Sequence, residues 1–350
     1  MYDHITSFPN LLLAWRKASR GKRGQPHVAA FEHRLEDHLF QLQDELRAQT
    51  YTPGPYTSFY IHEPKRRLIS AAPFRDRVVH HALCNLIEPL FERSFIFHSY
   101  ANRSGKGTHR ALDYAQRLSR RYPYVLQCDV EQFFPAIDHE ILSAALARKI
   151  PDERVRWLCG RILAGGRGVL AGEYRMAWFP GDDLLAPFRP RGLPIGNLTS
   201  QFWANVYLSP FDHFVTRELR RPCLRYVDDF LLFGGDRDEL WEAKTRLEGR
   251  LGELRLTIHP GAQPRPVSEG FPFLGFHLTP ERRRLKRRKG LYYQRKLRRL
   301  VRAYAAGELP LEQVTASVQG WANHTRYGNT VGLRKAILSR IPIGSVEHGL

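Results

Sequence analysis

The sequence predicts an α+β fold built around an antiparallel sheet. Residues 225–233 hold two adjacent carboxylates, Asp228 and Asp229, between apolar and aromatic flanks that are typical of two short buried strands joined by a tight turn. A second apolar run, 124–128, ends at Asp129. Elsewhere apolar residues recur at the three- and four-residue spacing of helices. If the strand ending at Asp129 pairs beside the hairpin, the three aspartates meet above one sheet.

Three carboxylates from two strands suggest a specific chemistry. Hard oxygen donors suit Mg²⁺, which takes one or two carboxylates per ion together with substrate phosphates. Two such ions about 4 Å apart can activate an attacking hydroxyl and stabilise a leaving pyrophosphate. An aspartate pair at a turn is by itself more often a surface turn. Asp129 upstream is what favours a catalytic site for nucleotidyl transfer.

Composition narrows the class of protein. The chain has 350 residues, enough for about two or three subdomains with a sizeable core. Its net charge of +19 indicates a polyanionic partner, the alternative being a merely soluble basic protein. The four cysteines stand far apart without a CxxC pair, which argues against a zinc site or a disulfide framework and fits a reducing cytoplasm. No apolar run reaches about 18 residues and the N-terminus lacks a signal-peptide pattern, so a cytoplasmic protein without a membrane partner is expected.

The first part of the chain alternates helical and extended patterns. Residues 1–50 carry apolar residues at helical spacing. Residues 51–72 alternate aromatic and polar side chains between prolines, which predicts short strands. Residues 74–120 return to helical spacing, and Asp138 is placed to cap a helix through 141–146.

The middle of the chain is the least regular. Glycines and prolines within 151–191 predict loops. The pair Asp182 and Asp183 lacks flanking strands, so a surface turn is expected there. Residues 236–270 are expected to hold a helix and then a strand around 254–258.

The C-terminal part is basic and helical. Residues 281–303 are dense in lysine and arginine, with two tyrosines interleaved and an apolar stripe. Such a helix beside a duplex channel would neutralise phosphates without reading sequence. Trp321, in a further apolar stretch, is expected to be a core residue rather than a stacking platform.

Several motifs resemble those of reverse transcriptases. Tyr226-Val227-Asp228-Asp229 resembles the YxDD box, and Asp129 resembles the first palm aspartate of that family. Further boxes follow in the family's order: 67–70 and 74–80 resemble the fingers motifs, 192–201 the template- and nucleotide-facing box, and 273–276 the primer grip. The resemblance covers the chain from roughly residue 55 to the basic C-terminal helices. It implies a right-hand polymerase with fingers, palm and thumb that copies template RNA into cDNA from a DNA primer, using dNTPs.

The resemblance also implies a division of the chain. The N-terminal extension and fingers would occupy 1–122. The palm would occupy 123–280, with a fingers-side insertion near 151–191. The basic helical thumb would occupy 281–350.

The resemblance to reverse transcriptases implies catalytic roles for the three carboxylates. Asp129, Asp228 and Asp229 would be catalytic and would hold two Mg²⁺ ions, for which Mn²⁺ could substitute, and Val130 would lend its carbonyl. The family places a lysine after the strand near 254–258 as the acid for pyrophosphate. This chain has none there, so the general acid stays open.

The remaining roles concern the nucleotide and the nucleic acid. Arg67 would contact the triphosphate, and its planar fork can hold two phosphate oxygens. Phe134, five residues after Asp129, would lie under the sugar and exclude a 2′-hydroxyl. Ile195, Gly196 and Gln201 would face the nucleotide. The residues expected to contact nucleic acid are Tyr226, Leu274, Gly275, Arg287, Arg288, Lys289 and Arg295.

The box at 195–201 points to a subtype. Most reverse transcriptases have Gln-Gly at its start and Ser-Pro at its end, whereas this chain has Ile195-Gly196 and Ser200-Gln201. That pattern resembles the bacterial enzymes of diversity-generating retroelements, which copy a template-repeat RNA unfaithfully at adenines during mutagenic retrohoming. They work with a small basic accessory variability determinant protein. The alternatives are a retron-like or antiphage-defence reverse transcriptase, and a non-catalytic maturase-like RNA-binding scaffold.

Overall fold

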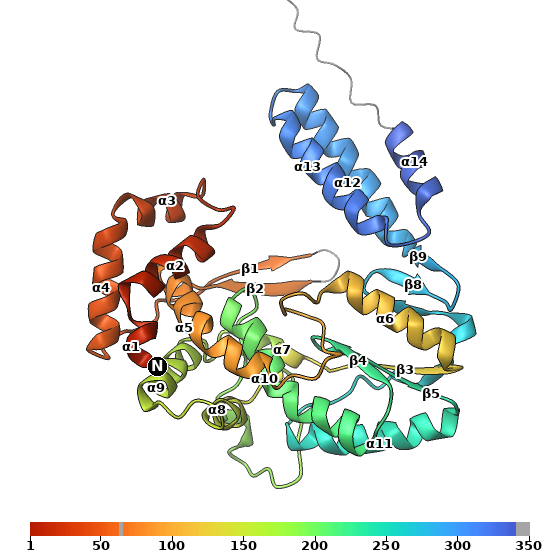
Figure 1. The fold of residues 1–350 in the computed structure, drawn as a ribbon, viewed down its shortest axis with the longest axis horizontal. Helices are drawn as coiled ribbons and strands as arrows, with labels where there is room; N and C mark the ends of the chain where they lie inside the picture. The colour runs from red at the N-terminus through yellow and green to blue at the C-terminus, as the bar shows by residue number, and fades with distance from the viewer. Residues whose placement is uncertain (63–65, 341–350) are drawn as a thin grey trace, which may run out of the picture.

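The computed structural model describes residues 1–62 and 66–340. Figure 1 shows a helical N-terminal part, a central sheet flanked by helices, and a separate group of helices at the C-terminal end. Within the described residues, no helix is both long enough and apolar enough to cross a membrane. All four cysteines are buried as free thiols.

The N-terminal part is helical, as expected. Every fourth or third residue of its fourth helix is buried, which gives one apolar face to the core. A β-hairpin of strands β1 and β2 follows α4 in the chain and extends away from these helices (Figure 1). The elements are α1 Tyr2–Ile5, α2 Phe8–Ser19, α3 Pro26–His33, α4 Leu35–Arg47, β1 Thr57–Ile61, β2 Arg67–Ala71 and α5 Phe74–Glu92.

The central sheet is antiparallel throughout, with strand order β4-β5-β3-β6. Side chains alternate between its two faces. Along β5, Phe230 and Leu232 join the larger core, whereas Leu231 and Phe233 join a second core on the other face. The strands are β3 Tyr124–Asp129, β4 Cys223–Tyr226, β5 Asp229–Gly234 and β6 Pro264–Pro266.

Helices cover both faces of this sheet. The larger core contains buried residues of α8, α9, α10 and α11. The second core contains α6 and the short strands β7 and β8. Asp138 caps α8 by accepting hydrogen bonds from the amides of Glu140 and Ile141, which confirms its predicted role. The bounds are α6 Thr108–Arg121, α7 Phe133–Ala136, α8 His139–Ala147, α9 Glu153–Gly165, α10 Leu198–His213, α11 Arg237–Glu253, β7 Phe271–Phe273 and β8 Phe276–Leu278.

The middle of the chain differs from the sequence expectation in two places. The loops expected at the glycines and prolines within 151–191 are present after residue 165, but no helix was expected in this segment and α9 occupies 153–165. Its buried residues Val155, Leu158 and Ile162 follow helical spacing, and Asp152 caps it by accepting from the Arg154 amide at 3.1 Å. The strand expected around 254–258 is a single bridge between Ile258 and Val130.

The remaining loop, 166–197, has two short 3₁₀ turns, Ala171–Glu173 and Ala186–Phe188. Asp182 closes a turn, since its amide donates to the Phe179 carbonyl at 3.0 Å, and Asp183 follows it on the surface. The surface turn expected for the pair is therefore found at Asp183, whereas the Asp182 side chain is only 4% exposed. The Asp182 carboxylate pairs with Arg189.

The C-terminal helices form their own small core. Strand β9 extends the β7-β8 hairpin and leads directly into α12, which packs on α13. Trp321 stacks on Tyr293 with ring centroids 4.3 Å apart, which confirms it as a packing residue. The elements are β9 Arg283–Leu285, α12 Arg287–Ala305, α13 Leu311–Thr325 and α14 Val331–Ser339.

Candidate active site

Strand pairing places two of the three aspartates side by side. Asp129, the last residue of β3, stands directly opposite Asp229, the first residue of β5. Asp229 in turn pairs with Tyr226, the last residue of β4. Residues directly opposite each other in antiparallel strands point to the same face. The two carboxylates and the tyrosine therefore share one face at one end of the sheet.

The third aspartate lies in the turn itself. Both Asp228 and Asp229 were expected in the turn, and this expectation was wrong by one residue. Val227 and Asp228 form the two-residue connection, and Asp229 already belongs to β5. Val227 has a φ of 60°, which a two-residue hairpin turn requires but a β-branched residue rarely adopts.

Burial and neighbouring charges change the pKa of the Asp228 carboxyl. Burial raises the pKa of the Asp228 carboxyl, and the nearby negative charge of Asp129 raises it further. The guanidinium groups of Arg67 and Arg225 act in the opposite direction. Arg67, on β2, is thus close enough for its charge to act on Asp228.

The backbone of Val130 faces the hairpin. The Glu131 amide donates to the Thr257 carbonyl and the His259 amide donates to the Asp129 carbonyl, each at 2.9 Å. The residue between, Val130, instead donates its N–H to the Asp228 carbonyl at 3.3 Å. In an extended strand the N–H and C=O of one residue point to the same side. The Val130 carbonyl therefore points toward the hairpin rather than toward Thr257.

These donors fit a divalent cation. Among residues 1–62 and 66–340, no group of three His, Cys, Asp or Glu side chains is gathered closely enough to hold a metal ion. Mg²⁺, however, takes only one or two carboxylates from a protein and completes its shell with water and phosphate. Asp129, Asp228 and the Val130 carbonyl supply hard oxygens, and a cation would relieve the repulsion that raises the Asp228 pKa.

The box at 195–201 is tied to strand β2. The Ser70 amide donates to the Ile195 carbonyl at 2.8 Å. Gly196, with a φ of 115°, lies against Ile69. Asn197 donates to the Ser70 carbonyl at 2.8 Å and accepts from the Ala72 amide at 3.1 Å. Sequence reasoning assigned no role to Asn197, although its position before α10 made it a candidate helix cap.

Phe134 lies beside the same box. It belongs to α7 and is half-buried, with its ring edge-on to Phe133 at 5.4 Å between centroids. Its carbonyl accepts from the Leu193 amide at 2.9 Å. Gln201 is exposed on the first turn of α10. The structure thus brings Phe134 together with Leu193 of the box, five residues after the strand that ends at Asp129.

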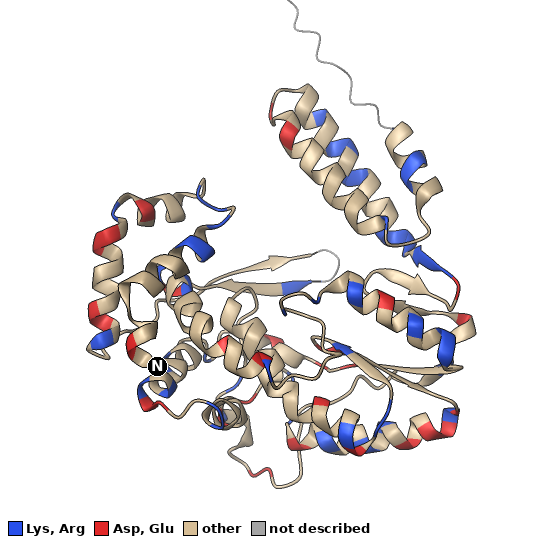
Figure 2. Ribbon diagram, viewed as in Figure 1, with Lys and Arg blue, Asp and Glu red and all other residues tan. Residues whose placement is uncertain are grey.

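The predicted nucleic-acid residues fall into separate groups. Tyr226 forms a hydrogen bond with the Thr108 hydroxyl at 2.9 Å, beside the aspartates. Leu274 and Gly275 form the β7-β8 turn with positive φ values, and the side chain of Lys289 lies against Gly275. Arg287, Arg288 and Arg295 are exposed on α12. Figure 2 shows lysine and arginine along α12 and β9.

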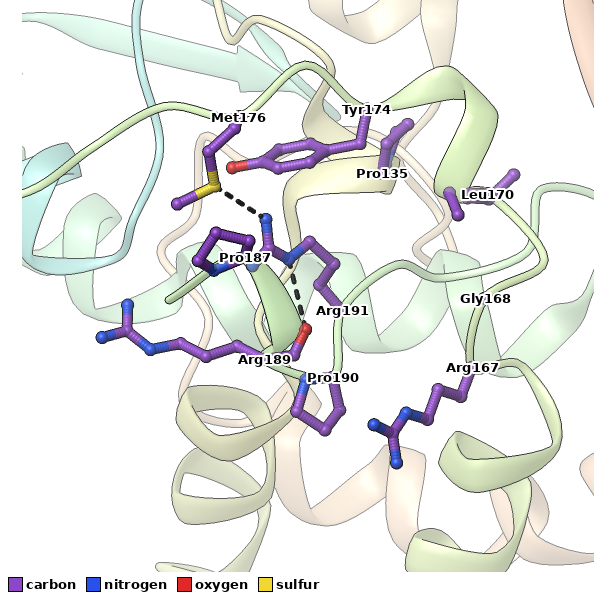
Figure 3. A pocket seen from close by; sticks show the side chains of 11 residues that line it. Pro135, Arg167, Gly168, Leu170, Tyr174, Met176, Pro187, Arg189, Pro190 and Arg191 are labelled. Atoms are coloured by element: carbon purple, nitrogen blue, oxygen red, sulfur yellow. Dashed lines mark hydrogen bonds between the residues drawn. The ribbon is translucent and has the colours of Figure 1, made fainter. Parts of the chain in front are cut away.

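A pocket of about 330 Å³ lies beside Pro135, in a place that sequence reasoning did not single out. Figure 3 shows Arg191 next to the ring of Tyr174, with its guanidinium carbon 4.5 Å from the ring centroid. Arg191 donates to the Arg189 carbonyl and to the sulfur of Met176, and Arg189 pairs with Asp182. These two arginines are therefore engaged in holding the loop together.

Comparison with known proteins identifies the family. A family model described as reverse transcriptase (RNA-dependent DNA polymerase) matches residues 61–278, well over half of the chain. The chain belongs to the reverse transcriptase family. It is therefore an RNA-directed DNA polymerase with the right-hand fold, as the sequence predicted. Such a reverse transcriptase works on template RNA, a primer and dNTPs, and the family generally uses Mg²⁺.

Individual relatives are more distant. Protein YkfC of Escherichia coli (strain K12) is 27% identical over 293 residues, which cover 72% of this reverse transcriptase and 74% of YkfC. Group II intron-encoded protein LtrA of Lactococcus lactis subsp. cremoris is 25% identical over 183 residues, covering 51% of this chain and 28% of LtrA. A solved structure of apo telomerase from Candida tropicalis has a TM-score of 0.44 at 11% identity, covering 65% of this chain and 48% of that chain.

Proposed function

We propose that Asp129, Asp228 and Asp229 form the catalytic centre of this reverse transcriptase and hold two Mg²⁺ ions, with the Val130 carbonyl as a further ligand. Two observations support this proposal. Asp129 pairs directly with Asp229 across the sheet, and the negative charge of Asp129 raises the pKa of the Asp228 carboxyl. When bound, the ions would activate the primer hydroxyl and stabilise the leaving pyrophosphate. Arg67 would hold the triphosphate from β2.

The test is Asp228→Asn, which keeps the shape of the side chain and removes its negative charge. We expect primer extension to be abolished while binding of template RNA is retained. Asp183→Asn, in the surface turn, is the matched control and should extend at the wild-type rate. Extension within about tenfold of wild type, with normal metal dependence, would remove Asp228 from the proposed centre.

We also propose a division of the hand. Fingers would comprise residues up to 122, palm 123–280 and thumb 281–350. The apolar core formed by Tyr293, Leu297, Val314 and Ile337 supports a thumb that folds as a unit. We assign Arg287, Arg288, Lys289 and Arg295 to the phosphates of the template–primer duplex, and Leu274 and Gly275 to the primer.

We further propose that this enzyme copies its template with errors at adenines, as part of a diversity-generating retroelement. This proposal rests on the identity of Ile195, the residue before Gly196 in the box. The structure ties this part of the box to β2. A glutamine at this position could donate a hydrogen bond to the nucleotide, whereas isoleucine cannot. A lost contact of about 1.4 kcal/mol corresponds to roughly a tenfold loss of discrimination. An accessory variability determinant protein would then be a partner.

Sequencing of cDNA made on a defined RNA with all four bases tests this proposal. Wild-type errors should concentrate opposite template adenine, and Ile195→Gln should reduce them. Leu193→Ile, elsewhere in the same box, is the control. Rare errors spread evenly over the bases would instead favour a retron-like or antiphage-defence enzyme.

A second candidate is suggested by the relatives, since LtrA is named as a group II intron-encoded protein. An intron-type RNA would then be the template, and an enzyme that binds RNA without extending a primer would be the maturase-like alternative. RNA that copurifies with the protein separates these candidates, because a template repeat and an intron have different sequences.

A further inference from the structure

Arg225 is one of the largest fully buried side chains in the described part of the chain, with 2% of its surface exposed. It lies on β4, one residue before the Tyr226-Val227-Asp228-Asp229 box. A buried guanidinium is costly unless its donors are satisfied and its charge is paired. The arrangement around Arg225 meets both conditions.

The partners of Arg225 come from two directions. Asp212 on α10 accepts two bonds, from Nε at 2.7 Å and from Nη2 at 2.6 Å. Nη1 donates to Oδ1 of Asn205, also on α10, at 3.1 Å and to the carbonyl of Val227 at 2.8 Å. One planar group thus bridges a helix and the turn that carries Asp228.

The turn needs such a partner. Val227 has the positive φ that L side chains with a branched Cβ rarely adopt, so its conformation costs free energy unless the surroundings hold it. The Arg225 bond to the Val227 carbonyl holds the strained peptide directly. The backbone of Arg225 is fixed as well, because its amide donates to the His98 carbonyl and its carbonyl accepts from the Tyr100 amide, each at 2.9 Å.

The helix that supplies Asp212 and Asn205 also begins at the nucleotide box. Helix α10 starts at Leu198, directly after Gly196 and Asn197. A rigid helix therefore has the box at one end and the partners of Arg225 further along. We propose that Arg225 is a positioning residue that fixes the Val227–Asp228 turn against α10 and so keeps Asp228 in register with the bound nucleotide. This role adds to the proposed catalytic centre and rests on it.

A purely structural ion pair would behave differently. It would contribute to folding, and its loss would lower the amount of folded enzyme without changing the properties of the folded fraction. Lysine keeps the charge of Arg225 but has no planar fork, so it cannot bind both oxygens of Asp212 and also reach Val227. Arg225→Lys therefore keeps the positive charge and removes the hydrogen bonds that bridge Asp212 and Val227.

The experiment measures primer extension per folded enzyme as a function of Mg²⁺ concentration. For Arg225→Lys we expect kcat to fall about tenfold or more, and the Mg²⁺ concentration for half-maximal rate to rise at least threefold, with template RNA binding unchanged. Arg221→Lys, at the more exposed pair with Glu239, is the matched control and should match wild type. Wild-type kcat and Mg²⁺ dependence in folded Arg225→Lys would overturn the proposal.

A rescue variant tests the mechanism. Glycine adopts a positive φ without strain. Val227→Gly added to Arg225→Lys should therefore recover part of the lost kcat, whereas a merely structural role of Arg225 predicts no recovery. If Arg225→Lys does not fold, Asn205→Ala decides, since it keeps the ion pair and removes one acceptor of Nη1. An unchanged Mg²⁺ dependence in that variant would overturn the proposal, and a shift of about twofold or more would support it.

These outcomes are distinguishable from failure of the catalytic assignment. If Asp228→Asn remains active, the centre itself has been placed wrongly. If Asp228→Asn is inactive and Arg225→Lys is normal, the centre stands and only the positioning role fails.

Discussion

Gly196 and Ile69 approach each other so closely that a Cβ added at Gly196 would lie 3.0 Å from Cγ2 of Ile69. This contact joins the box before α10 to strand β2. Gly196 also has a φ of 115°, in the region where side chains are strained. Both effects oppose any substitution at this position.

We therefore expect Gly196→Ala to raise the KM for dNTPs several-fold, because the box must shift away from β2. Steady-state primer extension with varied dNTP checks this. Gly181→Ala is the control, since Gly181 also has a positive φ, 84°, but no atom within 4 Å of an added Cβ. An equal effect of both substitutions would assign the change to backbone strain alone.

Removing the ring of Phe134 should admit ribonucleotides. Phe134 is half-buried and follows Asp129 by five residues, the position from which its ring is proposed to exclude a 2′-hydroxyl. For Phe134→Ala we expect the preference for dNTP over rNTP to fall at least tenfold in single-nucleotide incorporation. Phe97→Ala, at a ring that is 70% exposed, is the control. Undiminished exclusion of rNTPs would show that another residue guards the sugar.

Binding of a template–primer duplex should depend steeply on salt through α12. Each phosphate that the protein neutralises contributes roughly 0.9 to the slope of log K against log salt for a duplex. Arg287→Ala with Arg288→Ala should flatten this slope by about two units if both contact phosphates. The pair Arg237→Ala with Arg246→Ala on α11 is the control. An unchanged slope for the α12 variant would place that helix away from nucleic acid.

Acid should destabilise the protein through His80. Burial lowers the pKa of His80 to about 3, and the charges of His81 and Arg77 contribute. The unfolded chain takes up a proton near pH 6.5 and the folded protein does not, so the free energy of unfolding falls as the pH drops from about 6.5 toward 3.

Urea unfolding at pH 7, 6 and 5 measures this loss. His80→Gln, which cannot be protonated, should flatten the pH dependence by roughly the amount expected for His80. The exposed His33→Gln should leave it unchanged. Parallel curves for wild type and His80→Gln would show that other groups control the acid sensitivity.

The parts of the fold that sequence could predict are those governed by short-range pattern. The flanks of Asp228 and Asp229 are apolar on both sides, so a hairpin was foreseeable, and the apolar run before Asp129 indicated its neighbouring strand. The pattern does not set the register to the residue, which is why Asp229 lies in β5 rather than in the turn. Helix α9 was missed because the glycines at its end outweighed its apolar spacing.

The parts that could not be predicted depend on long-range contacts. The chain has 54 lysines and arginines, and nothing in the local sequence of Arg225 marks it as buried. Its burial depends on Asp212 and Asn205, which α10 brings against the Arg225 side chain. Asn197 is similar, since its partners at Ser70 and Ala72 are more than a hundred residues away.

The burial of all four thiols has a practical consequence. Burial raises the pKa of each of them, so they react slowly with maleimides. A cysteine introduced at exposed Phe59 on β1 and another at exposed Leu311 on α13 would therefore be labelled ahead of the native ones. Fluorophores at these two sites would report the distance between the proposed fingers and the proposed thumb in single molecules. Any change of that distance during synthesis could then be followed in the otherwise native enzyme.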